Sequence, residues 1–277
     1  MENKQSSTGK FNSWFAVIAI VASLAVCYAL YFWVLGDPAN FQGNNVNNHP
    51  KEGNYLGIVY KGGLIVPILM SMLLMVIVFS VERGFTILKA YGSGSVNSFV
   101  RKIKSFLSMN DISSAIAECE KQKGSVGNVA FSVLSRYKQI ASDNNLVKEQ
   151  KVVALQKELE ESTSLELPML EKNLTIIATL ASIATLVGLL GTVIGMIKAF
   201  AALATAGAPD AVALANGISE ALINTALGIA SSALAIISYN FYTSKIDELT
   251  YSIDEIGYSI TQTFNANVPE TKKELAV

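Results

Sequence analysis

The sequence has few of the side chains that enzymes use at their active sites. Its 277 residues include two cysteines, Cys27 and Cys119, and one histidine, His49. Cys27 lies in an apolar segment and Cys119 in a charged one, so the pair predicts neither a disulfide framework nor a metal site. His49 stands alone in a polar stretch. No P-loop, nucleophile elbow, HExxH or CxxC pattern occurs. We therefore expect no enzyme, no bound metal and no cofactor.

Charge is also scarce, and neither sign dominates. Charged residues make up 16% of the chain, whereas soluble domains carry about 25%. The net charge is −1, and no basic patch with interleaved aromatic residues appears, so nucleic-acid binding is not expected. Hydrophobic residues make up 51% and the mean hydropathy is +0.39. This composition predicts a membrane protein.

Four apolar stretches are long enough to cross a bilayer, which takes about 20 residues. The predicted transmembrane helices are residues 14–35, 64–81, 175–200 and 213–241. Pro67 is tolerable because it lies near the start of the second helix. The first stretch is longer than the apolar core of a secretory signal and ends in aromatic residues typical of a membrane interface. We interpret it as an uncleaved anchor.

Lysine and arginine set the expected orientation. Most of the 21 in the chain fall between the second and third spans, and the positive-inside rule places this region in the cytoplasm. An even number of spans leaves both termini inside. The predicted segments outside the spans are a cytoplasmic N-terminus 1–13, an outer loop 36–63, a cytoplasmic helical domain 82–174, an outer loop 201–212 and a cytoplasmic C-terminal helix and tail 242–277.

The segments outside the membrane differ in their expected order. The loop 36–63 is rich in asparagine, glycine and proline, which predicts turns and a flexible connection and not a folded domain. The insert 82–174 has apolar residues at helical spacing, with Asp111 as a candidate N-cap. A further helix is expected from Lys148, with a bend near Pro168, running directly into the third span.

The third span carries small and hydroxyl residues on one face. At steps of three or four they are Thr175, Thr179, Ser182, Thr185, Gly188, Thr192, Gly195 and Ala199. Small residues at this spacing let helices approach closely in lipid, and Gly191 is expected to act in the same way. From this span alone, ordinary packing and a proton route are equally good interpretations.

The fourth span contains a carboxylate, Glu220, in a run that is otherwise uncharged after Asp210. Ionisable residues at bilayer depth are costly and usually functional. The alternatives are a structural Glu satisfied by neighbouring hydroxyl groups and a Glu near a helix end whose side chain reaches to the membrane surface.

Polar side chains form two lines along this fourth span. One line holds Glu220, Asn224, Ser231 and Ser238, and the other holds Thr225, Ser232 and Tyr239. We expect one line to meet the third span and the other to meet a neighbouring chain or a central cavity. Oligomerisation around a shared axis would bury both lines.

Residues 187–200, VGLLGTVIGMIKAF, and 217–242, GISEALINTALGIASSALAIISYNFY, closely resemble the MotA/TolQ/ExbB proton-channel family. The preceding residues 170–186 and the VERGF of residues 81–85 fit as well. Among the branches of this family, the sequence most resembles ExbB, and TolQ is the next most similar. The chain departs from the family at Thr185, where a proline is common, late in the last span, where it reads SALAII, and in its extra first span.

The resemblance implies an all-α, polytopic protein of the bacterial inner membrane that forms a homo-pentamer among membrane lipids. The long third and fourth spans would line its centre, and the loops 36–63 and 201–212 would be periplasmic. An ExbD-like single-span partner would supply an intramembrane Asp. Protons passing through the complex would energise TonB, which acts on outer-membrane transporters.

The resemblance also assigns roles by position. Glu220, Thr192 and Thr225 match the proton pathway. The residues expected to line the pore or pack helices are Thr185, Gly188, Gly191, Gly195, Asn224 and Ser231. Two other interpretations stay open: a TolQ-like or gliding-motility stator subunit, and a non-conducting membrane scaffold in which Glu220 anchors subunits by hydrogen bonds.

Overall fold

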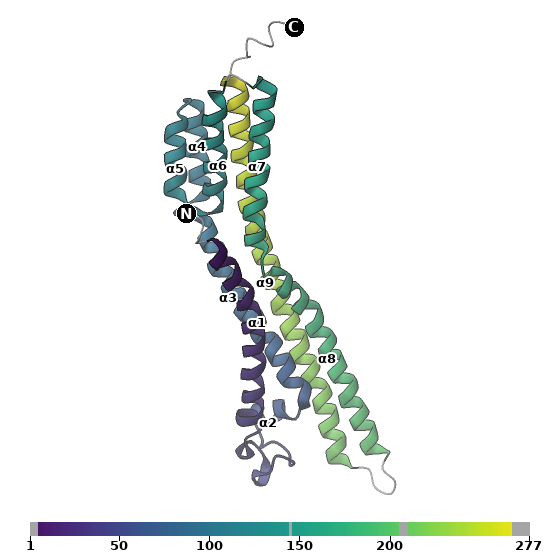
Figure 1. The fold of residues 1–277 in the computed structure, drawn as a ribbon. Helices are drawn as coiled ribbons and strands as arrows, with labels where there is room; N and C mark the ends of the chain where they lie inside the picture. Colours follow the sequence, from purple (N-terminus) through teal and green to yellow (C-terminus); the bar gives the residue numbers. More distant parts are fainter. Residues whose placement is uncertain (1–4, 144–145, 205–209, 268–277) are drawn as a thin grey trace. The chain divides into compact units, whose positions relative to one another are not determined.

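The chain is helical through most of its length (Figure 1). The computed structural model describes residues 5–143, 146–204 and 210–267, with side chains from Trp14 onward. Within these residues the only extended pairing is an isolated bridge between Phe41 and Pro50. Parts of four predicted segments lie outside the described residues: 1–4 of the N-terminus, 144–145 of the predicted cytoplasmic domain, 205–209 of the second predicted outer loop and 268–277 of the tail.

Four helical stretches are long and apolar enough to cross a membrane, as predicted. They are Trp14–Leu35, Gly63–Ser108, Lys148–Leu203 and Ala211–Asn267. The chain divides into two compact units, one formed by residues 1–81 and 173–240 and the other by 82–172 and 241–277. The expectation of an all-α polytopic membrane protein with four transmembrane helices is confirmed.

The first unit contains α1 (Gln5–Leu30), η1 (Tyr31–Leu35), α8 (Leu174–Leu203) and the beginnings of α3 (Val66–Tyr91) and α9 (Ala211–Asn267). One face of α1 is buried at four-residue spacing, through Ala19, Ser23, Cys27 and Tyr31. The rings of Phe15 and Phe79 meet edge-on, with centroids 6.3 Å apart, so α1 packs on α3. Asp210 caps α9 because its Oδ1 accepts the amides of Val212 and Ala213 at 3.0 Å.

The segment between α1 and α3, which was predicted to be an outer loop, is more ordered than its composition predicts. It contains η2 (Pro38–Asn40), η3 (Gln42–Asn44), α2 (Tyr55–Tyr60) and η4 (Gly63–Ile65). Phe41 is fully buried, and its ring lies 5.6 Å from that of Tyr60, which in turn stacks on Tyr31 at 4.7 Å. Three aromatic rings therefore give this segment a small core.

Polar side chains close the turns of the same segment. Asn40 Nδ2 donates to the carbonyls of Val34 and Leu35 at 2.8 and 3.1 Å. Lys61 Nζ donates to the carbonyls of Val46 and Asn47 at 3.0 and 3.1 Å. The abundant asparagine that predicts turns thus supplies the bonds that fix them.

The second unit is a helical bundle. It contains α4 (Val96–Ser108), α5 (Ile112–Gln122), α6 (Gly124–Ala141) and α7 (Lys148–Glu171), each packed against the next, together with the end of α9. Asp111 caps α5 as expected, since its Oδ1 accepts the Ser114 amide at 3.0 Å. This part of α9 contributes a stripe buried at helical spacing: Ile246, Leu249, Ile253, Ile256, Ile260 and Phe264.

The sequence predicts a bend near Pro168, but in the structure the helix is interrupted later, between Glu171 and Leu174. Pro168 lies inside α7, which ends at Glu171, and Asn173 takes the left-handed conformation with φ 64° before α8 begins at Leu174. Asparagine tolerates this conformation better than most residues because its short side chain can bond the local backbone. The prediction of a helix that continues directly from Lys148 into the span was therefore wrong at this residue.

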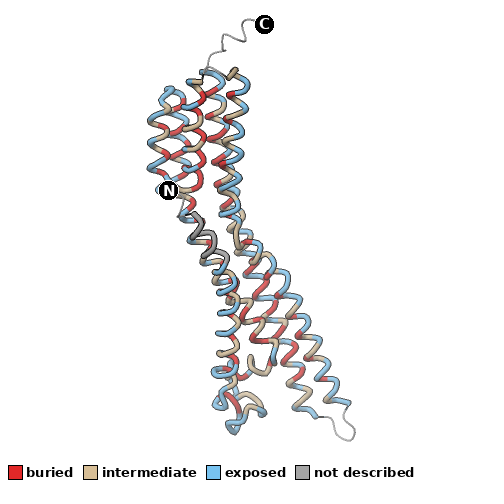
Figure 2. Tube along the Cα trace, viewed as in Figure 1, coloured by how far each residue is buried: buried red, intermediate tan, exposed pale blue. Residues whose placement is uncertain are grey.

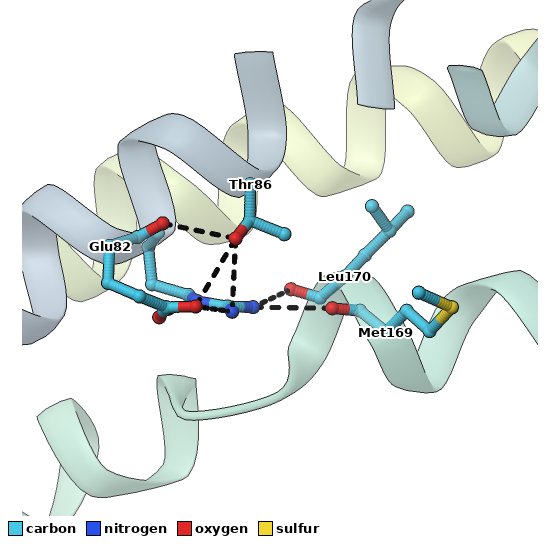
Figure 3. A network of polar contacts seen from close by, with 5 residues as sticks. Glu82, Thr86, Met169 and Leu170 are labelled. Carbon is cyan, nitrogen blue, oxygen red and sulfur yellow. Dashed lines mark hydrogen bonds and ion pairs between the residues drawn. The ribbon is translucent and has the colours of Figure 1, made fainter. Parts of the chain in front are cut away.

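A buried arginine caps the end of α7 (Figure 3). Arg83, on α3, is 2% exposed, and its Nη1 donates to the carbonyls of Met169 and Leu170 at 3.3 and 3.1 Å. These carbonyls lie in the last turn, where helix carbonyls lack partners further along the chain. The guanidinium also pairs with Glu82 at 2.5 Å. Arg83 therefore supplies the bonds that the interrupted helix cannot make.

Candidate functional site

The candidate site is built on the antiparallel pair of α8 and α9, which approach through small residues. Their buried positions lie along the line where the two helices face each other (Figure 2). A Cβ built on Gly195 would lie 2.6 Å from the backbone nitrogen of Ala221, and one on Gly188 would lie 3.0 Å from the Cα of Gly228. The backbones are thus too close for larger side chains, as small-residue helix packing in lipid requires.

Two threonines face each other across this contact. The hydroxyl groups of Thr192, on α8, and Thr225, on α9, are in direct hydrogen-bond contact. Each hydroxyl oxygen also lies 3.1 Å from a carbonyl of its own helix, that of Gly188 for Thr192 and that of Ala221 for Thr225. One hydroxyl group donates to the other, and the second is then free to donate to its own helix carbonyl. The pair is part-buried and keeps both hydroxyl groups on the side where the helices meet.

Glu220 is buried and has an ionic partner. Lys198 Nζ, on α8, lies 2.6 Å from Oε1 and 2.8 Å from Oε2. The Glu220 side chain is only 9% exposed, whereas that of Lys198 is 56% exposed. The sequence predicts Glu220 as a solitary charge in the fourth span, and Lys198, near the end of the third span, was not predicted as its partner. The carboxylate is therefore charge-compensated within its own chain.

A glycine turn covers Glu220 from the start of α3. Gly63 adopts φ 79°, and a Cβ there would overlap the Glu220 carboxylate. Asn224 Nδ2 donates to the carbonyl of Gly62 at 2.9 Å, which ties the turn to α9 one helical turn from Glu220. Gly62 and Gly63 therefore allow the backbone to approach the acid where any side chain would block it.

The two polar lines of α9 find partners inside the chain. Thr225 and Ser232 both meet α8, since Ser232 Oγ donates to the Ala181 carbonyl at 2.5 Å. Asn224 packs against Gly191 of α8 and also reaches the turn before α3. The prediction for the line that contains Asn224 considered only a neighbouring chain or a cavity, and did not consider the turn before α3 as a partner within the chain.

The other predicted site residues divide between the packed face and the surface. Gly188, Gly191, Gly195 and Asn224 are buried at the contact of α8 with α9, and Ser231 is fully buried with its hydroxyl bonded to the Leu227 carbonyl at 2.8 Å. Thr185 instead lies on an exposed face of α8. Its exposed hydroxyl-bearing neighbours on that face are Thr175, Thr179 and Ser182.

Chemically, the site offers a carboxylate, an ammonium group and two hydroxyl groups. Within residues 5–143, 146–204 and 210–267 no group of three or more His, Cys, Asp or Glu side chains is placed to hold a metal ion. A carboxylate bridged by an ammonium, with two facing hydroxyl groups on the same helices, offers one titratable acid and neighbouring hydrogen-bonding groups. This combination suits proton exchange inside an apolar helix pair.

Comparison with known proteins finds a family similarity over the α8–α9 pair. The family model that matches, over residues 129–255, is described as the MotA/TolQ/ExbB proton channel family, and the match runs from within α6 into α9. The match includes Glu220, Lys198 and both threonines, so the predicted resemblance is confirmed over this part of the chain.

Curated relatives carry the names of two branches of the MotA/TolQ/ExbB family. The Tol-Pal system protein TolQ of Haemophilus influenzae is 32% identical over 121 residues, 44% of this chain and 52% of the relative. The biopolymer transport protein ExbB of Helicobacter pylori is 44% identical over 80 residues, 29% of this chain and 55% of the relative. The TolQ of Pseudomonas aeruginosa is 40% identical over 80 residues, 29% of this chain and 35% of the relative. The chain thus spans about half the length, or less, of these relatives.

Proposed function

We propose that the chain is the proton-channel subunit of an energy-transducing complex in the bacterial inner membrane. The observation that carries the proposal is the Glu220 site: a carboxylate 9% exposed on a helix apolar enough to span a membrane. A buried acid in such a helix is costly, which favours a functional role. Thr225, one to two turns after Glu220 on α9, and Thr192 of α8, which contacts it, are proposed to order water on the same route.

The complex is proposed to be a homo-pentamer with both termini in the cytoplasm. The exposed hydroxyl face of α8, with Thr175, Thr179, Ser182 and Thr185, supports assembly. Hydroxyl groups that face hydrocarbon gain from a helix or a hydrated centre opposite them. Thr185 is therefore proposed to face the pore, while Gly188, Gly191 and Gly195 hold the helix pair that carries it.

The proposed partner is an ExbD-like single-span subunit with an intramembrane Asp, and the proposed output is energised TonB. The name of the H. pylori relative, a biopolymer transport protein, supports this role. A TolQ-like role in the cell envelope is the second candidate, because the match to H. influenzae TolQ runs over 121 residues. The single-span protein that co-purifies with the chain distinguishes the two roles.

Proton flux tests the proposal. Vesicles containing the chain and its co-purifying single-span protein are loaded with a pH-sensitive dye and given a membrane potential. Glu220→Gln keeps the size of the side chain and an oxygen that can accept from Lys198, so we expect normal assembly and loss of flux. Asp247→Asn is the matched control, because Asp247 is an exposed acid on the same helix. Equal flux in E220Q and D247N would show that the chain is a scaffold or conducts by another route.

A further inference from the structure

Lys198 is the one charged residue between Lys172 and Asp210, and the proton route as proposed does not use it. It lies five residues before the end of α8, about 8 Å along the axis at 1.5 Å per residue. A lysine so placed can extend its stem along the helix and keep its ammonium near the surface. Its ammonium instead turns to Glu220 and bridges both carboxylate oxygens. This contact needs an explanation beyond solvation.

The side chains of Lys198 and Glu220 differ sharply in conformational freedom. The Lys198 side chain is 56% exposed and that of Glu220 is 9% exposed. Lysine has a flexible four-carbon stem, and exposed side chains change rotamer within nanoseconds. The carboxylate is held more firmly, because the Gly62–Gly63 turn lies against it and Asn224 ties that turn to α9. When the pair separates, Lys198 is therefore the partner that moves.

The charges around the carboxylate are few. Lys198 contributes the positive charge from α8, and the tyrosine of η1, Tyr31, lies within electrostatic range of Glu220. The Tyr31 hydroxyl donates to the Tyr60 carbonyl at 3.2 Å. An opposite charge at hydrogen-bond distance favours the ionised form of an acid. Lys198 is therefore the counter-charge that the structure places at the Glu220 carboxylate.

We propose that Lys198 is a movable counter-ion that keeps Glu220 charged while it is in contact and releases it for protonation when it swings away. This inference rests on the proposed proton route and assigns its control to a residue outside the polar lines of α9. Lys198 acts through Glu220 and is a positioning residue. Arginine in its place preserves the charge, whereas methionine preserves the length and removes the charge.

Carbodiimide labelling tests the inference without measuring transport. Dicyclohexylcarbodiimide reacts with protonated carboxyl groups in apolar surroundings, and mass spectrometry of the purified full chain in lipid nanodiscs reports the labelling rate at Glu220. We expect Lys198→Met to label about tenfold faster than the wild type or more, since a close opposite charge shifts an acid's protonation by at least that factor. Lys198→Arg should label like the wild type. Lys51→Met, in the outer segment, controls for the loss of a lysine elsewhere.

Each outcome separates this inference from the proposed function. Equal labelling of K198M and wild type overturns the counter-ion role, even where E220Q abolishes flux. Faster labelling of K198M together with normal flux in E220Q supports the counter-ion and overturns the proton route. Where K198M does not insert stably, Lys198→Gln, which is neutral and still hydrogen-bonds, replaces it with the same expectation.

Discussion

Replacing Arg83 by methionine should open the end of α7. The change removes two bonds to the Met169 and Leu170 carbonyls and the ion pair with Glu82. Breaking a buried ion pair costs about 3–5 kcal/mol, and each bond from a charged donor contributes about 1.5–3 kcal/mol. Because Glu82 is 24% exposed and regains water, we place the net loss near the lower end, at about 3 kcal/mol.

Hydrogen exchange measures this loss where it occurs. Since about 1.4 kcal/mol corresponds to a factor of ten, amides in the last turn of α7 should exchange about 100-fold faster in R83M. Lys89→Met is the control, because Lys89 lies on the same helix and is exposed. Arg83→Lys should be intermediate, since one ammonium cannot reproduce the fork of a guanidinium. Equal exchange in R83M and K89M around residues 165–172 would refute the capping role.

Two further predictions concern the helix pair and the bundle. Gly195→Ala places a methyl group 2.6 Å from the Ala221 backbone nitrogen, so the free energy of unfolding in detergent should fall by about 1–3 kcal/mol. Gly84→Ala is the control and should be tolerated, because its added methyl meets only the Tyr242 hydroxyl at 3.2 Å. Equal losses of stability in the two variants would contradict the close-contact explanation. Hydrogen bonds from Ser114 lower the pKa of Asp111, so its contribution to stability is present above the unfolded pKa and disappears as pH falls through the folded pKa. Asp111→Ala should therefore melt earlier than the wild type at neutral pH and together with it in acid, and a difference that persists in acid would argue against the cap.

The spans and most helices could be predicted because each depends on local composition. Apolar length alone identifies four membrane helices, and the predicted spans 175–200 and 213–241 each lie within one uninterrupted helix, α8 and α9. The cap at Asp111 follows from its side-chain chemistry in the same way. The break at Asn173 could not be predicted from Pro168, because that proline removes only a bond to the carbonyl of Ser164, one turn earlier, and α7 continues past it to Glu171. The carbonyls at the end of α7 are bonded by Arg83, which is distant in sequence.

Predicting the Lys198–Glu220 pair requires the register of α8 against α9, which the sequence of neither helix gives alone. Gly188 faces Gly228 and Ala199 faces Gly217, so small residues on the two helices are paired in antiparallel order. Aligning these small residues would have brought Lys198 beside Glu220 and indicated the counter-ion. The glycine turn over Glu220 gave no such signal, because Gly62 and Gly63 lie more than 150 positions away from Asn224. Local patterns thus predict the acid but not its surroundings.

The segment between α1 and α3 is continuous with the Gly62–Gly63 turn that lies against Glu220. Phe41 stacks its edge on Tyr60, which precedes Gly62 by two residues, and Gly62 is bonded to Asn224. Phe41→Ala, which empties the centre of this small core, would therefore loosen the backbone that lies against Glu220. The packing of a segment far from α8 and α9 in sequence thus helps to hold the surroundings of the acid.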